Sequence, residues 1–140
     1  MHPLRKLREA GSITLAKIKL LLAEDVVFHS PILVKPVEGR EKVAAMFAVS
    51  LGVRQGSYVA EHRLDDRTTL LVWKGKIQGR EIESFEMLTD DLHGLLIERT
   101  VAYRPFPAIQ IFRNEMYREL KGILGPEYWS YTPGDPSTLP

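Results

Sequence analysis

The sequence contains no cysteine. This absence excludes disulfide bonds, catalysis by a thiolate and metal sites with cysteine ligands. A chain without cysteine is also compatible with a reducing compartment, where disulfides are rare. Histidine adds little, because nothing pairs His62 or His93 at metal-ligand spacing. We therefore expect neither a bound metal nor a cofactor.

Long hydrophobic runs are also missing. One apolar stretch, residues 13–22, is interrupted by Lys17 and Lys19, and it is shorter than the roughly 20 residues of a membrane-spanning helix. The N-terminal residues lack the apolar segment and small-residue cleavage site of a signal peptide. We therefore expect no membrane partner and a cytoplasmic location.

An excess of charge of either sign is absent too. The 140 residues carry a formal net charge of +1, with 44% hydrophobic and 26% charged residues. This length and composition are those of one ordinary globular domain. A near-zero net charge, without basic and aromatic residues interleaved on a strand, argues against nucleic acid as a partner.

What is present is a strong hairpin pattern in residues 79–105. Asp and Gly in residues 90–94 predict a turn, because both tolerate the backbone conformations that turns need. Side chains alternate between the two faces of a strand. One face of the first strand carries Ile82, Ser84, Glu86 and Leu88, and one face of the second carries Leu95, Ile97, Arg99, Val101 and Tyr103. A lone charge in an apolar row is costly to bury unless it is paired, so we predict that Glu86 and Arg99 are partners.

The other helices and strands are predicted from helix-capping residues, from proline and glycine, and from the spacing of apolar residues. Ser12 predicts the start of a helix over residues 13–23. A β-branched and aromatic strand over residues 26–30 ends at Pro31. We further predict a helix over residues 40–51 ended by Gly52, strands over residues 57–64 and 69–77, and a last helix over residues 108–121 with the apolar stripe Ile109, Phe112, Met116 and Leu120.

The two ends of the chain are less patterned. Residues 2–8 fit either a helical turn or two packed on the body or a partly ordered arm, and both interpretations stay open. We predict one domain over residues 1–122, followed by a proline-rich, aromatic tail over residues 123–140 that is partly disordered. Tyr128, Trp129 and Tyr131 are too aromatic for a pure linker, and we expect them to pack on a surface or a second subunit.

This order of elements predicts the α+β class. We expect a curved antiparallel sheet wrapped around the N-terminal and middle helices, with a C-terminal helix. A sheet wrapped around helices leaves a cone-shaped cavity, and such cavities are common ligand sites.

The chain resembles the SnoaL-like branch of the nuclear transport factor 2-like superfamily. The resemblance lies in LLAEDVVFHSP followed by VEGREKVAAMF, and in an acidic strand followed by D-x-x-G and a strand that ends in Arg-Pro. It covers roughly residues 13–120. The family implies a cystatin-like cone that often dimerises through its open sheet face. It includes ketosteroid isomerase, limonene epoxide hydrolase, scytalone dehydratase and polyketide cyclases, so function has to come from the site.

The functional residues of ketosteroid isomerase can be compared one by one with the residues at the matching positions of this sequence. The resemblance implies that Ser30 stands where that enzyme has its aspartate general base, and that Phe47 stands where it has a tyrosine. Glu86 matches its second acid, which donates a hydrogen bond to the developing oxyanion. The tyrosine on its first helix has no match, so steroid isomerase chemistry is not expected. The Asp–Arg–Asp relay of epoxide hydrolases is also missing, and Glu86 with Arg99 is a partial analogue of it.

The same resemblance implies a pocket that suits a small, largely hydrophobic ligand held by one or two hydrogen bonds. His29 alternates away from Ser30 and becomes a candidate only if the strand bends near Pro31. The implied lining is Phe28, Ser30, Phe47, Leu71, Trp73, Ser84, Glu86, Arg99, Val101 and Tyr103.

Glu86 and Arg99 are the candidate catalytic residues, and two interpretations of them stay open. In the first, a homodimeric SnoaL-like domain binds a small hydrophobic molecule, and Glu86 supplies any acid/base chemistry. In the second, a non-catalytic dimeric interaction or scaffold module uses Glu86 and Arg99 as a structural ion pair. Burial raises the pKa of Glu86 and a nearby Arg99 lowers it, so the sequence does not assign its protonation state.

Overall fold

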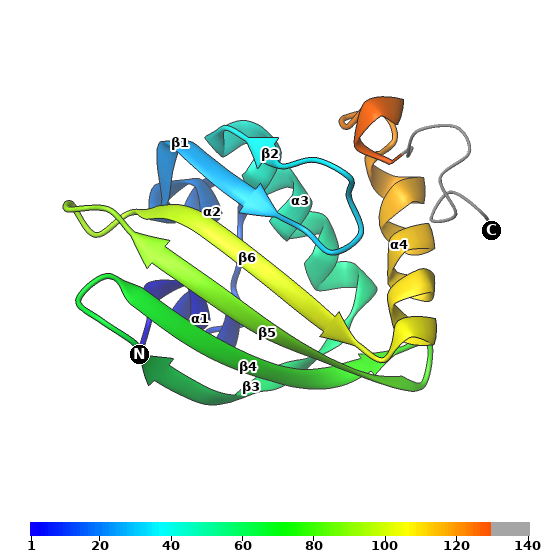
Figure 1. The fold of residues 1–140 in the computed structure, drawn as a ribbon, viewed down its shortest axis with the longest axis horizontal. Coiled ribbons are helices and arrows are strands. Elements are labelled where there is room, and N and C mark those ends of the chain that lie inside the picture. The colour runs from blue at the N-terminus through cyan, green and yellow to red at the C-terminus, as the bar shows by residue number, and fades with distance from the viewer. Residues whose placement is uncertain (130–140) are drawn as a thin grey trace.

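A six-stranded sheet in the order β2-β1-β6-β5-β4-β3 frames the computed structural model, which describes residues 1–129 (Figure 1). The strands are β1 (Leu22–His29), β2 (Val37–Glu38), β3 (Gln55–Arg63), β4 (Thr68–Ile77), β5 (Arg80–Asp90) and β6 (Leu96–Arg104). The meander from β3 to β6 is antiparallel, as predicted. However, β1 pairs with β6 in parallel, so the sheet is mixed and the expectation of an antiparallel sheet holds only in part. The reason is that the chain crosses from the β1 edge to the far edge before the meander returns it to β1.

Helices cover one face of this curved sheet, which confirms the predicted α+β class. They are α1 (Pro3–Glu9), α2 (Leu15–Leu21), α3 (Arg40–Val53) and α4 (Phe106–Leu120), with a short 3-10 helix η1 (Pro126–Tyr128). In Figure 1 the helices α1, α2 and α3 lie behind the sheet, and α4 lies at its end. α4 packs against α3 and reaches β4, β5 and β6. Within the described residues, no helix is both long and apolar enough to cross a membrane.

The predicted hairpin is present as β5 and β6, and its first strand alternates as expected. Ile82, Ser84, Glu86 and Leu88 are all buried. On β6 the predicted inward face holds for Arg99 and Val101 but fails at the start of the strand. Leu96 is buried there, whereas Leu95 and Ile97 are only half-buried. The pairing shifts between Thr89 and Asp90, and an extra residue in one strand reverses which side chains face inward.

Several helix boundaries differ from the predictions. The helix expected over residues 13–23 begins at Leu15, because Thr14 rather than Ser12 caps it by accepting a hydrogen bond from the Lys17 N–H at 3.2 Å. It also ends earlier, because the chain enters β1 at Leu22. The middle helix runs through Gly52 to Val53. Glycine costs a helix only about 1 kcal/mol, which packing of the helix on the sheet overrides.

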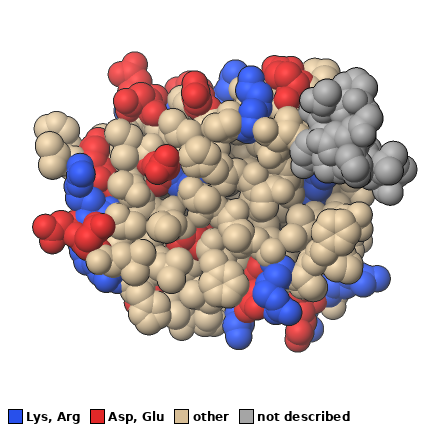
Figure 2. Space-filling model, in the orientation of Figure 1, with Lys and Arg blue, Asp and Glu red and all other residues tan. Residues whose placement is uncertain are grey.

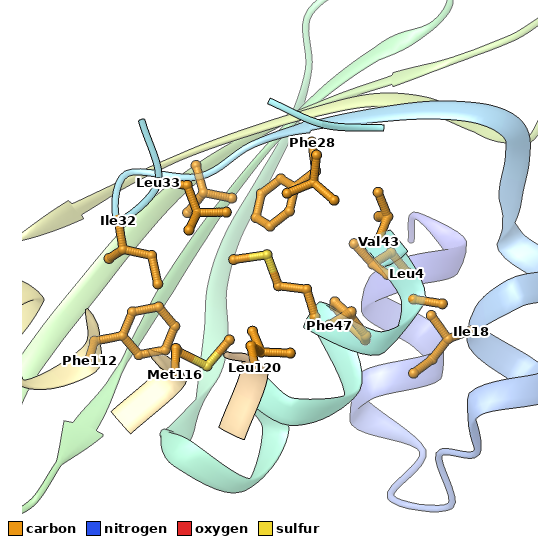
Figure 3. Packing of buried hydrophobic residues seen from close by; sticks show 14 of the residues in the cluster. Leu4, Ile18, Phe28, Ile32, Leu33, Val43, Phe47, Phe112, Met116 and Leu120 are labelled. Atoms are coloured by element: carbon orange, nitrogen blue, oxygen red, sulfur yellow. The ribbon is translucent and has the colours of Figure 1, made fainter. Parts of the chain in front are cut away.

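The core lies between the concave face of the sheet and these helices. Figure 3 shows Phe28 from β1 facing Val43 and Phe47 from α3, with Phe112 and Met116 from α4 alongside. These residues are at most 5% exposed. The predicted apolar stripe of α4 is confirmed except at one position, where Ala108 is buried and Ile109 is only half-buried.

The last described residues also pack on the body. Tyr128 and Trp129 are buried, and the backbone of Val34 donates a hydrogen bond to the Tyr128 carbonyl at 2.8 Å. The Trp129 ring meets the Tyr117 ring edge-on at 5.2 Å between centroids. The expectation that these aromatic residues pack on a surface is therefore confirmed for Tyr128 and Trp129. Tyr131 and the rest of the predicted tail lie outside the described residues.

The N-terminal segment is an integral helix rather than a partly ordered arm. Leu4 on α1 is 1% exposed within the core. The His2 ring lies 3.0 Å from the Asp90 carboxylate, and Arg5 lies 3.4 Å from Glu61. α1 thus connects the start of the chain to β3 and β5 and covers that end of the cone.

Replacing Leu4 with alanine should lower the free energy of unfolding by about 2–5 kcal/mol, the usual cost of removing a buried leucine side chain. Chemical denaturation followed by circular dichroism measures the change. Leu92→Ala is the matched control, because Leu92 is 86% exposed and surface changes stay within about 0.5 kcal/mol. A Leu4→Ala effect as small as that of the control would restore the interpretation as a loose arm.

Candidate functional site

A buried carboxylate lies at the centre of the concave face. Glu86 occupies the middle of β5, between Leu71 on β4 and Val101 on β6, and is fully buried. Its Oε1 accepts a hydrogen bond from Arg99 Nη2, so the ion pair predicted from the sequence is present. The Tyr58 hydroxyl donates to its Oε2 at 3.1 Å. Both carboxylate oxygens therefore have partners.

The surroundings of Glu86 keep it ionised. Burial alone would raise the pKa of this carboxyl, but the guanidinium groups of Arg99 and Arg54 outweigh burial, and the pKa lies below its ordinary value. Burial likewise lowers the pKa of Arg99, and the Glu86 carboxylate more than reverses that effect. Glu86 and Arg99 thus stabilise each other's charged forms.

Tyr58 links this pair to the N-terminal helix. Burial, followed by the charge of Glu86, raises the pKa of Tyr58 to about 12, so its hydroxyl stays protonated and can donate to the carboxylate. Arg8 on α1 donates a hydrogen bond to the same hydroxyl at 3.2 Å. The Arg8 guanidinium also lies 5.3 Å from the centroid of the Trp73 ring, within cation–π range.

A second buried arginine follows α3 directly. The Arg54 side chain has 0% exposure, and its Nη2 lies 3.7 Å from the Oε1 of Glu86. Its guanidinium carbon lies 4.2 Å from the centroid of Trp73 and 5.1 Å from that of Tyr103. Among the described residues, none accepts a hydrogen bond from its three guanidinium nitrogens. Burial is the main reason that the pKa of Arg54 is lowered.

The Trp73 ring reaches its place because two glycines leave room for it. A Cβ atom on Gly75 would lie 2.4 Å from the ring, and one on Gly56 would lie 2.6 Å from it. Real Cβ atoms do not approach so closely, so any other residue would displace the ring that supports Arg54 or the backbone of the neighbouring strand, which is as close. Because side chains alternate along a strand, Trp73 and Gly75 share one face of β4, and this contact explains why they occur together.

Glu86, Arg99, Tyr58, Arg8 and Arg54 form one cluster. A small cavity with a volume of about 10 Å³ adjoins this cluster at Arg99. That is about the smallest volume that holds one water molecule. Its lining contains aromatic residues, two methionines, two serines and one charged side chain. The lining residues are Phe28, Ser30, Met46, Phe47, Ser50, Arg99, Tyr103, Phe112 and Met116.

Part of the pocket implied by the resemblance lines this cavity, and part does not. Phe28, Ser30, Phe47, Arg99 and Tyr103 lie in its wall. The other predicted residues lie buried in the same interior without contacting the cavity, and these are Leu71, Trp73, Ser84, Glu86 and Val101.

His29 stays away from this interior, as its alternation predicts. Its Nε2 lies 3.2 Å from Glu98, and both side chains are well exposed. In residues 1–129, no group of three or more histidine or acidic side chains is arranged to hold a metal ion.

Comparison with solved structures gives two matches over 86% of both chains. One is an uncharacterized bacterial protein with a cystatin-like fold from Silicibacter pomeroyi DSS-3, with 25% identity and a TM-score of 0.78. The other is a steroid delta-isomerase from Pseudomonas aeruginosa, with 28% identity and a TM-score of 0.75. The chain has the cystatin-like fold, and these matches support its resemblance to the nuclear transport factor 2-like superfamily.

A more distant match shares the fold alone. It is a SnoaL-like protein of unknown function from Burkholderia thailandensis E264, with 15% identity and a TM-score of 0.58. The match covers 74% of the present chain and 91% of the other. Neither a family sequence model nor a curated protein matches the chain.

Sequence reasoning missed three members of the buried cluster around Glu86. Arg54 follows the end of a helix, where a basic residue is ordinarily explained by the helix dipole. Tyr58 is the buried residue of a strand whose alternation is weak. Arg8 stands among other basic residues near the N-terminus. The one usable signal was the Gly56 and Gly75 pair, which leaves space for a large ring beside Arg54.

Replacing Glu86 with glutamine should lower the free energy of unfolding by about 3–5 kcal/mol at neutral pH, because two buried guanidinium groups lose their carboxylate. The folded-state pKa of Glu86 lies below its unfolded value of about 4.5. The contribution of Glu86 to the free energy of unfolding is therefore fully present above the unfolded pKa and is lost as the pH falls through the folded pKa. Denaturation curves from about pH 7 to about pH 3 should show the gap between the wild type and the variant narrowing.

Glu81→Gln is the matched control for this experiment, because Glu81 lies on the same strand but is exposed. It should change stability by less than about 0.5 kcal/mol at any pH. A Glu86→Gln gap that stays constant on acidification would mean that the pKa of Glu86 is the same in the folded and unfolded states, and a gap that widens would mean that the carboxyl is neutral in the folded state.

Proposed function

We propose that this protein binds a small, largely apolar molecule at the cavity inside its cone. The observation that carries the proposal is the cavity wall, where aromatic and methionine side chains surround one charged group, Arg99. Small-molecule sites combine such apolar walls with a few placed polar groups. A structure named as a steroid delta-isomerase matches 86% of this chain, which supports a ligand-binding role for the cone.

Acid/base chemistry at Glu86 is the less favoured form of this proposal. The carboxylate has partners on both oxygens and a lowered pKa, which suits it to hold Arg99 in position rather than to donate a proton. To act as a base it would have to exchange a partner for substrate. Ser30 and Phe47 line the cavity where the resemblance implies an aspartate and a tyrosine, so we do not propose steroid isomerisation.

A ligand larger than water enters this cavity by displacing side chains. Met46 and Met116 both line it and are buried. Methionine is unbranched and adapts its shape easily, so these two residues are the ones that yield. Ser30 is half-buried in the same wall. A larger side chain at this position would therefore obstruct the cavity.

A thermal-shift screen against small ketones, lactones, epoxides and aromatic acids tests the proposal. A compound that binds the folded state at 100 times its Kd adds about 2.7 kcal/mol of stability and raises Tm by several degrees. Ser30→Phe should abolish such a shift by filling the cavity wall. Ser57→Phe, on the exposed start of β3, should leave it intact. Shifts that persist in Ser30→Phe would place the ligand elsewhere, and a screen without any shift would count against the proposal.

The outer face of the sheet favours a second candidate function, a homodimeric interaction module. Val59, Phe85 and Met87 are exposed by 54%, 41% and 45% on this face. Figure 2 shows few charged residues across its middle, with Lys, Arg, Asp and Glu gathered mostly at its edges. An apolar patch with a polar rim is typical of a protein interface. In this candidate the cone remains filled by its own side chains, and Glu86 and Arg99 form a structural pair.

Phe85→Lys should convert the dimer to a monomer, because it places a charge at the centre of the apolar face. Sedimentation velocity at several protein concentrations measures the association. Leu92→Lys is the matched control, since it adds the same charge at an exposed apolar residue in the distant turn after β5. A wild type that sediments as a monomer, or a Phe85→Lys variant that remains dimeric, would contradict this use of the sheet face.

A further inference from the structure

The interior of the cone holds more positive than negative charge. Arg54 and Arg99 are buried, with side-chain exposures of 0% and 4%. Glu86 is the one acidic side chain within ion-pair distance of either arginine among residues 1–129. Two guanidinium groups and one carboxylate leave a formal excess of one positive charge. Uncompensated buried charge is costly, so this excess needs an explanation.

The excess belongs to Arg54. Arg99 donates a hydrogen bond to Oε1 of Glu86, whereas Arg54 Nη2 stays 3.7 Å from the same oxygen. Throughout the described part of the chain, Nε, Nη1 and Nη2 of Arg54 find no acceptor, and neither does Nε of Arg99. The Trp73 ring lies 4.2 Å from the Arg54 guanidinium carbon. This cation–π contact supports the group, but it supplies no hydrogen-bond acceptor to the three nitrogens.

These donors lie beside the cavity. Arg99 is part of the cavity wall. Tyr103 and Phe112 also line the cavity, and their ring centroids lie 5.1 Å and 5.9 Å from the Arg54 guanidinium carbon. Arg99, whose Nε has no acceptor among the described residues, is therefore in the cavity wall, and Arg54 lies next to two aromatic rings of the same wall.

We infer that the ligand of the cone is a carboxylate with an apolar body, bound through Arg54 and Arg99. This inference rests on the proposed function and specifies its ligand class. A monoanion matches the excess of one positive charge that the two fully buried arginines leave. The planar guanidinium fork matches a carboxylate through paired hydrogen bonds, and the aromatic and methionine wall accommodates the apolar part of the molecule.

Matched acids and amides test the inference. Benzoate, phenylacetate and 2-naphthoate are titrated by calorimetry against the full-length protein, each beside its uncharged carboxamide. We expect the best acid to bind at least about tenfold more tightly than its amide, the ratio that one charge-assisted hydrogen bond supplies. Arg54→Met should reduce this ratio to about one. Arg67→Met, which removes the same charge from an exposed turn, should preserve it.

The outcomes separate this inference from the proposed function. Acids and amides that bind equally would overturn the inference and leave the proposed function standing. If neither class binds, both are overturned. A ratio that persists in Arg54→Met would overturn the role of Arg54. Because the variant removes a buried charge that has no hydrogen-bond partner among the described residues and leaves Arg99 bonded to Glu86, we expect its Tm to equal or exceed that of the wild type, and Arg54→Gln serves as the second variant if Arg54→Met does not fold.

Discussion

The interior of the cone depends on a single carboxylate shared among four elements. Glu86 on β5 accepts a hydrogen bond from Arg99 on β6 at Oε1 and one from Tyr58 on β3 at Oε2. Arg54 at the end of α3 approaches Oε1. Desolvation offsets much of the attraction in such a cluster, so an apolar core of the same volume would be about as stable. What the carboxylate supplies instead is position, because it fixes where the two guanidinium groups lie relative to the cavity.

The first and last α-helices, α1 and α4, also contact this cluster. α1 brings Arg8 to the Tyr58 hydroxyl, which connects the N-terminal helix to the carboxylate through one hydrogen bond on each side. α4 brings Phe112 beside Arg54, and its Met116 lines the adjoining cavity. The cluster is thus enclosed by helices from both ends of the described chain, and a change in either helix alters the surroundings of the arginines.

The sequence predicted the parts of this arrangement that follow from local pattern. Two-residue alternation placed Glu86 inward, and the cost of an unpaired charge then predicted Arg99 as its partner. Alternation failed at Leu95 and Ile97, because a shift in strand pairing is set by the partner strand and leaves no local signal. Arg54 and Tyr58 were missed for a related reason. Their burial results from the way α3 packs on the sheet and β3 pairs along its edge, whereas their neighbours in sequence predict exposed positions.

The contrast between Arg99 and Arg54 bears on what the cone is for. A purely structural ion pair needs one arginine, and Arg99 already satisfies that need with direct hydrogen bonding to Glu86. Arg54 is buried without equivalent bonding to any described residue, although two glycines and a tryptophan ring are arranged to support it. Natural sequences depart from full polar satisfaction mainly at functional sites. A structural scaffold therefore explains Glu86 and Arg99 adequately, but it leaves Arg54 without a reason, and a carboxylate ligand supplies one.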